Sequence, residues 1–206
     1  MLTAFSKGLS LITVSELGDK TFFIAVILAM RHSRKIVFTG VLAALVAMTI
    51  ISVLVGQVAS LFPAKYVHYG EIILFIGFGI KLIYAASQMP QDSCDVEVVK
   101  EATEVVEKAE FKLSKKQVAT AIYIEPFVLT FIAEWGDRTQ IATIALSAAN
   151  NPVGVTIGAI IGHGICTALA VMGGRMLAGR ISERTLTFAG GGLFLLFGVL
   201  SLLEKM

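Results

Sequence analysis

The hexapeptide ELGDKT at residues 16–21 returns as EWGDRT at residues 134–139, an offset of 118 residues. The same offset aligns other residues of the two halves, namely Gly40 with Gly158, Thr49 with Thr167, and Gly56 with Gly174. Each copy stands within a long apolar stretch, which its acidic and basic residues interrupt. The chain is therefore predicted to consist of two related halves, each carrying one copy of the hexapeptide.

The composition indicates a protein that resides in a lipid bilayer. Of the 206 residues, 56% are hydrophobic and 16% are charged, and the mean hydropathy is +0.81, which is outside the range of ordinary soluble domains. The net charge of +2 offers no basic surface that would favour nucleic acid. The two cysteines are too few for a disulfide scaffold, so we expect free thiols. No GxxxxGK[ST] pattern occurs, so transport driven by ATP is unsupported, and we expect no resident cofactor.

Six segments are apolar over about 20 residues or more, the length that a helix needs to cross the hydrocarbon. They cover residues 4–30, 36–61, 68–88, 119–148, 153–178 and 186–204. Between the third and the fourth, residues 90–117 are predicted to form a solvated linker, because they hold seven acids and five lysines. Within the linker, apolar residues recur at helical spacing and predict an amphipathic helix; they are Val99, Ala102, Val106, Ala109 and Leu113.

The predicted fold is an all-α membrane protein with six transmembrane helices, arranged as two inverted three-helix repeats. The first repeat covers residues 1–89 and the second residues 118–206. The two must be inverted, because a unit of three spans returns the chain to the membrane from the opposite side. We expect the opening segment to remain in the mature protein, since the charges of the first hexapeptide interrupt its apolar run. Inverted repeats that meet near the midplane are typical of secondary transporters.

Lysine and arginine are unevenly distributed between the two sides of the predicted fold. One side would receive Arg31, Arg34, Lys35, Lys100, Lys108, Lys112, Lys115, Lys116, Arg175, Arg180 and Arg184, and the other only Lys7, Lys65 and Lys205. Because positively charged loops stay in the cytoplasm, we expect a cytoplasmic linker and termini that are outside or lumenal. The membrane would be the bacterial inner membrane, or the plasma or thylakoid membrane of a phototroph.

The two hexapeptides place acidic, basic and hydroxyl side chains near the middle of predicted spans. On a continuous helix the Glu, the Asp and the basic residue stand at i, i+3 and i+4 and share one face. An ionised side chain at this depth costs at least ~2.5–3.5 kcal/mol on insertion scales, so stability alone does not explain three in each copy. The glycines at positions 18 and 136 allow either close helix approach or local unwinding.

Together the two copies would bring four carboxylates, two cations and two hydroxyls to one cavity. The resulting formal charge of −2 matches a divalent cation, and oxygen ligands suit Ca²⁺, Mg²⁺ and Mn²⁺ far better than copper or zinc. When the cation leaves, carboxylates held close together in low dielectric cannot all stay ionised, so protons are expected to take its place. The pattern therefore predicts exchange of a metal ion for protons.

The duplicated E-x-G-D-[KR]-[ST] motif resembles that of the Golgi, plastid and cyanobacterial manganese/calcium cation–proton antiporter family, closest to its cyanobacterial manganese exporters. The resemblance covers nearly the whole chain, including six spans, the charged central loop and both motifs. It implies that the ion is bound by Glu16, Asp19, Glu134 and Asp137, supported by Lys20, Thr21, Arg138 and Thr139. It also implies a transporter without enzymatic activity, which removes Mn²⁺ or Ca²⁺ from the cytosol and is driven by inward proton flow.

Ionisable residues outside the motifs each have two interpretations. His163 would relay protons, or would only form hydrogen bonds between helices. Glu125 would attract cations from the cytosol, or would be a partly solvated residue at a helix start. Both stay candidates for the proton or cation route. Glu71 and His68 near the outer face, and Lys81 toward the cytoplasmic end, are assigned to interfacial solvation and left out of the site.

Other functions remain compatible with the sequence. A passive cation channel or an exporter of organic cations would also place acidic residues in the membrane. An intramembrane aspartyl protease would use the two Gly-Asp pairs as a catalytic dyad, although each aspartate here has a glutamate and a cation beside it. The partners common to the transporter hypotheses are the bilayer and the ion, and a homo-oligomer is open. Neither the choice of Mn²⁺ over Ca²⁺ nor the proton stoichiometry follows from the residues.

Overall fold

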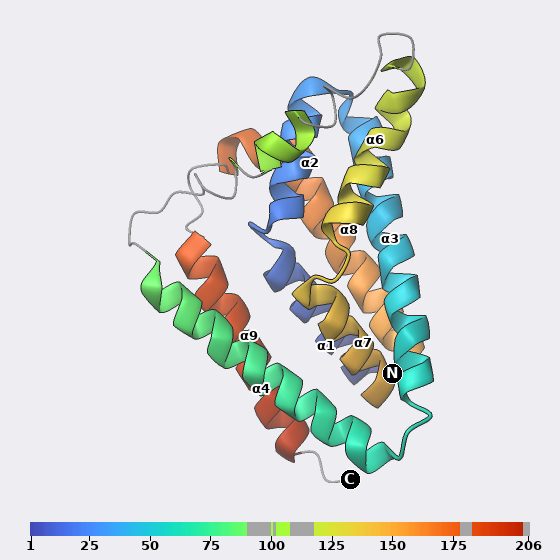
Figure 1. Ribbon diagram of the computed structural model, residues 1–206, viewed down its shortest axis with the longest axis vertical. Helices are drawn as coiled ribbons and strands as arrows, with labels where there is room; N and C mark the ends of the chain where they lie inside the picture. The colour runs from blue at the N-terminus through green and yellow to red at the C-terminus, as the bar shows by residue number, and fades with distance from the viewer. Residues whose placement is uncertain (90–99, 101, 108–117, 178–182, 204–206) are drawn as a thin grey trace.

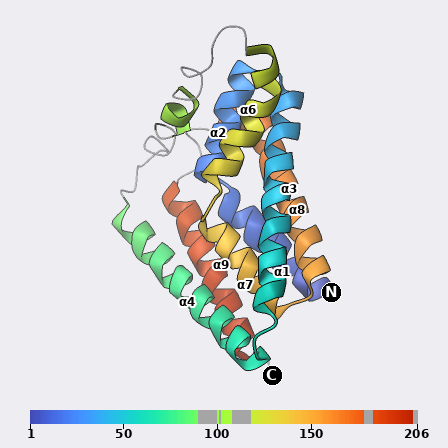
Figure 2. The same ribbon diagram turned by 45° about the vertical axis from the view of Figure 1, so that its right-hand side comes forward.

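The computed structural model describes residues 1–89, 100, 102–107, 118–177 and 183–203. The regular elements of these ranges are helices (Figures 1 and 2). They are α1 (Leu2–Glu16), α2 (Lys20–Arg31), α3 (Arg34–Ala59), α4 (Ala64–Gln88), α6 (Val118–Ala133), α7 (Arg138–Ala149), α8 (Pro152–Leu177) and α9 (Glu183–Leu203). Four segments are long and apolar enough to cross a membrane, namely Arg34–Ala59, Ala64–Gln88, Pro152–Gly173 and Arg184–Leu203.

Two of the predicted spans, 4–30 and 119–148, are broken helices. α1 ends at Glu16 and α2 begins at Lys20, while α6 ends at Ala133 and α7 begins at Arg138. In the interruptions Gly18 has φ 77° and Gly136 has φ 82°, a left-handed conformation that side chains disfavour and that glycine adopts without steric cost. The expectation that each motif shares one helical face is therefore wrong. Of the two roles considered for the glycines, local unwinding is confirmed at both positions, and Gly18 also lies in close contact with Leu186 of α9.

The helices contact one another mostly across the two halves of the chain. α1 packs along α8, α6 along α3, and α4 along α9. Figure 1 shows α1 starting and α9 finishing toward the same end of the molecule, which we call the terminal end. α2, α6 and residues 102–107 lie toward the opposite end, which we call the linker end. α4 and α9 form a pair that contacts α7 and α1 and diverges from the other helices toward the linker end (Figure 1).

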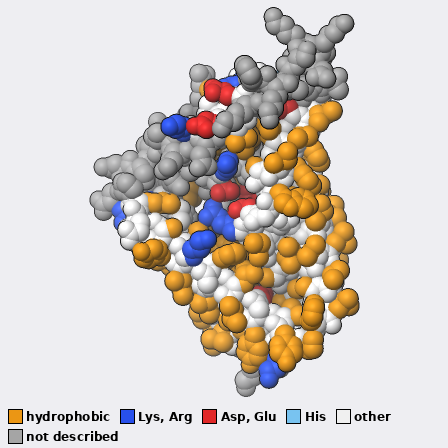
Figure 3. Space-filling view, in the orientation of Figure 1, with side chains coloured by type: hydrophobic (Ala, Val, Ile, Leu, Met, Phe, Trp, Pro, Cys, Tyr) orange, Lys and Arg blue, Asp and Glu red, His pale blue; other side chains and the backbone are white. Residues whose placement is uncertain are grey.

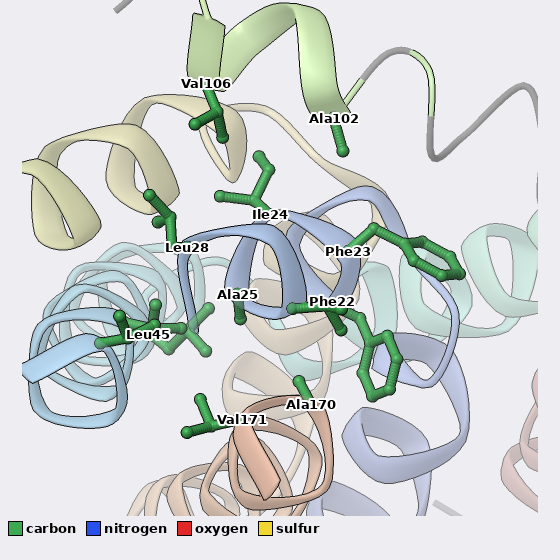
Figure 4. Packing of buried hydrophobic residues seen from close by; sticks show 13 residues of the cluster. Phe22, Phe23, Ile24, Ala25, Leu28, Leu45, Ala102, Val106, Ala170 and Val171 are labelled. Carbon is green, nitrogen blue, oxygen red and sulfur yellow. The ribbon is translucent and has the colours of Figure 1, made fainter. Parts of the chain in front are cut away.

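Two clusters of buried apolar side chains hold these helices together. One surrounds α2 and joins it to α3 and α8. Ala102 and Val106 complete this cluster by lying over Ile24 and Leu28 (Figure 4). Their burial agrees with the predicted amphipathic linker helix, whose other apolar positions lie outside the described residues. The second cluster joins α1, α4, α7, α8 and α9 and lies largely on the terminal side of the two interruptions, with Leu82 reaching the large cavity.

Candidate functional site

The two helix interruptions meet inside the molecule, although 118 residues separate them in sequence. Asp19 precedes α2 as its N-cap, and Arg138 is the first residue of α7. The Arg138 guanidinium donates a hydrogen bond from Nη2 to Asp19 Oδ1 at 2.8 Å. This ion pair links the motif of one half to the motif of the other. The two hexapeptides therefore meet at the points where their helices are interrupted.

Three of the four predicted ligands converge on one point. Glu16, Glu134 and Asp137 can each offer a carboxylate oxygen so that all three oxygens lie within 4.8 Å of one another. Glu16 and Glu134 are buried, and Oε1 of each has no hydrogen-bond partner. Burying unpaired carboxylate oxygens side by side is costly unless a cation or a proton joins them. The trio has the donor set and the spacing of a site for a hard cation.

The threonine of each motif hydrogen-bonds to the carboxylates beside it. Thr21 donates from Oγ1 to Glu16 Oε2 at 3.3 Å. Thr139 Oγ1 lies 3.0 Å from Asp137 Oδ2 and 3.5 Å from Glu134 Oε2, and the Thr139 backbone N–H donates to the same Asp137 oxygen at 3.3 Å. Asp137 is thus the capping residue of α7. These bonds fix the orientation of the carboxylates.

The helix ends give the site a mixed electrostatic character. α1 and α6 finish at the site, so the negative ends of their helix dipoles and their last carbonyls point toward it. α2 and α7 start there, so their positive ends stabilise the capping aspartates. Half-helices with this arrangement provide ligands and charge for small ions without further charged residues.

A cavity of about 550 Å³ reaches the two interruptions from the side of α4 and α9. Asp19, Asp137 and Arg138 line it from the site, and Lys81 lines it from α4. On the face shown in Figure 3, hydrophobic side chains predominate, and acidic and basic ones gather beside α4. Glu16 and Glu134 lie further in, against two separate cavities of about 10 Å³ each, room for roughly one water molecule. Asp137 therefore stands between the large cavity and the two buried glutamates.

The remaining candidates occupy different places. His163 on α8 is buried with Nδ1 3.9 Å from Glu16 Oε1, and it lines the small cavity beside Glu134. Lys20 is half-buried at the start of α2. Glu125 on α6 pairs with His32, with Oε2 and Nε2 3.5 Å apart, and is not among the residues that line the large cavity. The structure therefore brings His163 to the site, whereas Glu125 lies toward the linker end.

Gln140 takes a position at the site that the sequence did not indicate. Its Oε1 accepts a hydrogen bond from the Gly136 backbone N–H at 2.7 Å, and its Nε2 lies 3.7 Å from Met48 Sδ. Gln140 therefore holds the unwound turn of the second motif. The available signal was a neutral polar residue directly after the motif, in an otherwise apolar segment. Lys81 is a second residue that the sequence did not assign to the site. It was assigned to interfacial solvation, whereas in the structure it lines the large cavity.

Membrane-length helices, two broken helices and buried carboxylates at their junction define a membrane protein of the ion-transporter class. The family described as Divalent cation/proton antiporter GDT1 matches residues 4–90 and 122–206. The chain belongs to this family, and it is accordingly a transporter of the bilayer and not an enzyme.

Individual relatives extend the match over the whole chain. GDT1-like protein sll0615 of Synechocystis sp. is 54% identical over 206 residues, which is 100% of both chains. GDT1-like protein 3 of Arabidopsis thaliana is 45% identical, over 96% of this chain and 70% of its own. GDT1-like protein 3 of Oryza sativa subsp. indica is 43% identical, over 98% of this chain and 74% of its own. No solved structure matches the chain.

Proposed function

We propose that this antiporter exports Mn²⁺ from the cytosol in exchange for protons, with Ca²⁺ as the alternative ion. The observation that carries the proposal is the convergence of Glu16, Glu134 and Asp137 from the two motifs. Mn²⁺ comes first because the duplicated motif most resembles that of the family's manganese exporters. The donors at the site, three carboxylates and two threonine hydroxyls with the His163 nitrogen nearby, suit either ion.

In this proposal the ion passes from the large cavity to Asp137 and is then held by Asp137 and the two buried glutamates. Asp19 supports the site by anchoring Arg138 across the interface of the two halves. Thr21 and Thr139 orient the ligands, while Lys20 supplies a further positive charge near the first motif. His163 is a candidate for carrying a proton between Glu16 and the small cavity beside it, and Glu125 for attracting cations at the linker end.

Exchange follows from competition for the same carboxylate oxygens. Three ionised carboxylates carry a charge of −3, which a divalent cation reduces to −1. Without the cation, carboxylates this close together in a poorly solvated site cannot all stay ionised, so protons bind when the metal leaves. Two protons for one divalent ion would make the exchange electroneutral.

We propose that the chain crosses the membrane six times as two inverted repeats, residues 1–89 and 118–206. α1 with α2, and α6 with α7, would each make one crossing as a broken helix. The equivalent contacts of α1 with α8 and of α6 with α3 support this repeat. The distribution of lysine and arginine supports a cytoplasmic linker and external or lumenal termini.

Flux measurements in proteoliposomes test the proposal. A Mn²⁺ gradient should drive opposite proton movement, detected by a pH-sensitive dye inside the vesicles, and Glu134→Gln should abolish both fluxes. Glu107→Gln, a change of an exposed acid on the linker, is the matched control and should transport normally.

The competing functions predict different outcomes. Mn²⁺ flux without proton movement would indicate a passive channel, and transport restricted to organic amines would contradict a metal substrate. Proton exchange with Ca²⁺ but not Mn²⁺ would keep the site and change the ion. The protease hypothesis is set aside, because the chain belongs to a family of transporters.

A further inference from the structure

A buried polar cluster lies at the terminal end, away from the two motifs. Asn150, which ends α7, donates from Nδ2 to Glu71 Oε1 on α4 at 3.0 Å. Lys7 on α1 lies with Nζ 3.4 Å from Asn150 Oδ1, and His68 Nδ1 lies 4.0 Å from Glu71 Oε2. Glu71 and Lys7 are 3% and 4% exposed. The assignment of Glu71 to interfacial solvation is therefore wrong.

The cluster connects α4 to α1 and to the end of α7, two of the helices that meet at the motifs. Lys7 and Glu71 are close enough to interact electrostatically, and the buried hydroxyl of Ser201 on α9 lies beside the same carboxylate. A buried charge that loses its partner is strongly destabilised, so Lys7 and Glu71 depend on each other. The apolar cluster that includes Leu11, Phe75 and Phe194 lies on the same side of the motifs. Polar and apolar contacts together close the space between the α4–α9 pair and the helices α1 and α7.

A related pair lies at the linker end. There Glu125 on α6 approaches His32, the C-cap of α2, at 3.5 Å. Positions 7 and 125, and positions 32 and 150, are each separated by the 118-residue offset of the repeat. At both ends, then, a residue of the first half-helix of one repeat contacts the residue that caps the second half-helix of the other.

Glu71 has no acidic counterpart in the second repeat. The equivalent position is Ala189 on α9, which is exposed. The large cavity lies toward the linker end, between the motifs and the linker-side parts of the α4–α9 pair. Its lining includes Ala85 of α4, Met89 directly after α4, and Leu186 of α9. At the terminal end, Glu71 of α4 is buried against Lys7 and Asn150, and this end is closed. At the linker end, no acidic residue in the described part of α9 takes the equivalent place beside Glu125 and His32, and the large cavity is open there.

We propose that Lys7, Asn150 and Glu71 form a gate that holds the terminal end of the transporter closed while the cavity is open toward the linker. Opening of the terminal end requires that Glu71 leave Lys7 and Asn150 and that the α4–α9 pair move away from α1 and α7. The missing counterpart at position 189 makes the linker-open state the favoured one. Glu71 is in this sense a positioning residue, because it controls access and does not touch the ion. The contacts that form the gate do not depend on the proposed exchange of Mn²⁺ for protons. Only the purpose of the gate, which is to control access of the ion, rests on it.

Accessibility of a buried thiol tests the gate without measuring transport. Ala142→Cys on α7 places a thiol in the apolar cluster at the terminal end, in a background with Cys94→Ser and Cys166→Ala. A membrane-impermeant maleimide is added to the side that bears the C-terminus. Glu71→Ala should raise the labelling rate at least ~10-fold, because it removes a charge-assisted hydrogen bond and leaves Lys7 buried without it. Lys7→Met provides a second variant with the same expected effect.

The controls separate a gate from a general loss of stability. Glu125→Gln changes a buried glutamate at the opposite end and should leave labelling from the terminal side unchanged. Exchange of the two charges, Lys7→Glu with Glu71→Lys, should restore slow labelling. Unchanged labelling in both Glu71→Ala and Lys7→Met would overturn the gate, as would equally fast labelling in Glu125→Gln. Neither result would affect Mn²⁺ exchange by the unmodified protein, which decides the proposed function separately.

Discussion

Replacement of Gly136 by alanine should weaken Mn²⁺ binding without removing any ligand. Gly136 has φ 82°, and an added Cβ would meet no atom within 4 Å, so the backbone conformation alone determines the cost. An alanine in this region costs about 1–2 kcal/mol, which corresponds to ~5–30-fold in an equilibrium. The strain favours rewinding of the turn, which would carry Asp137 away from Glu134. We therefore expect the Mn²⁺ dissociation constant to rise by ~5–30-fold.

Isothermal titration of the purified protein with Mn²⁺ measures this effect, and two variants serve as controls. Gly136→Asn should bind better than the alanine variant, because asparagine tolerates the left-handed conformation. Gly77→Ala lies within α4, where an added Cβ also meets open space, and should leave binding unchanged. Wild-type affinity in Gly136→Ala would refute the view that the unwound turn positions the ligands.

Three further predictions follow from the same geometry. Thr139→Val should raise the Mn²⁺ dissociation constant by ~2–10-fold through loss of a hydroxyl donor to Asp137 and Glu134, whereas Thr39→Val on α3 should not; equal affinities would argue against ligand orientation by Thr139. Arg138→Lys should slow transport, because lysine keeps the charge but replaces the planar guanidinium that bonds to Asp19; an unchanged rate would show that charge alone suffices. Val106→Asp should expose the 102–107 segment to limited proteolysis, since it places a carboxylate in the cluster on α2; unchanged cleavage would mean that this contact does not hold the segment.

Hydropathy and the repeated hexapeptide were sufficient to predict an all-helical membrane protein and to single out the acidic residues that meet at the two interruptions. They could not predict the helix breaks, because a hydropathy window averages over an interruption of three or four residues. Glycine at positions 18 and 136 was compatible with close helix approach and with unwinding alike. The positive φ that distinguishes the two belongs to the folded backbone.

Pairing between the halves was also inaccessible from local spacing. The i, i+3 and i+4 spacing of Glu16, Asp19 and Lys20 suggests contacts within one helix. In the structure, however, Asp19 forms an ion pair with Arg138 of the other motif. Only the folded structure shows that Asp19 pairs with Arg138 while the other three carboxylates converge on one point. Likewise, Glu71 lies near the end of a predicted span, where residues in contact with solvent and residues between helices have the same sequence signature. Its burial depends on Lys7 and Asn150, which are distant in the chain.

The central claim is that metal and protons compete for one group of carboxylates formed by Glu16, Glu134 and Asp137. The most direct test is the Mn²⁺ affinity of the purified protein measured across pH 5.5 to 8. Affinity should fall as the pH is lowered, by about tenfold per pH unit for each proton displaced, and Asp137→Asn should weaken binding and flatten this dependence. An affinity that is the same at every pH, or that Asp137→Asn leaves unaltered, would contradict the account.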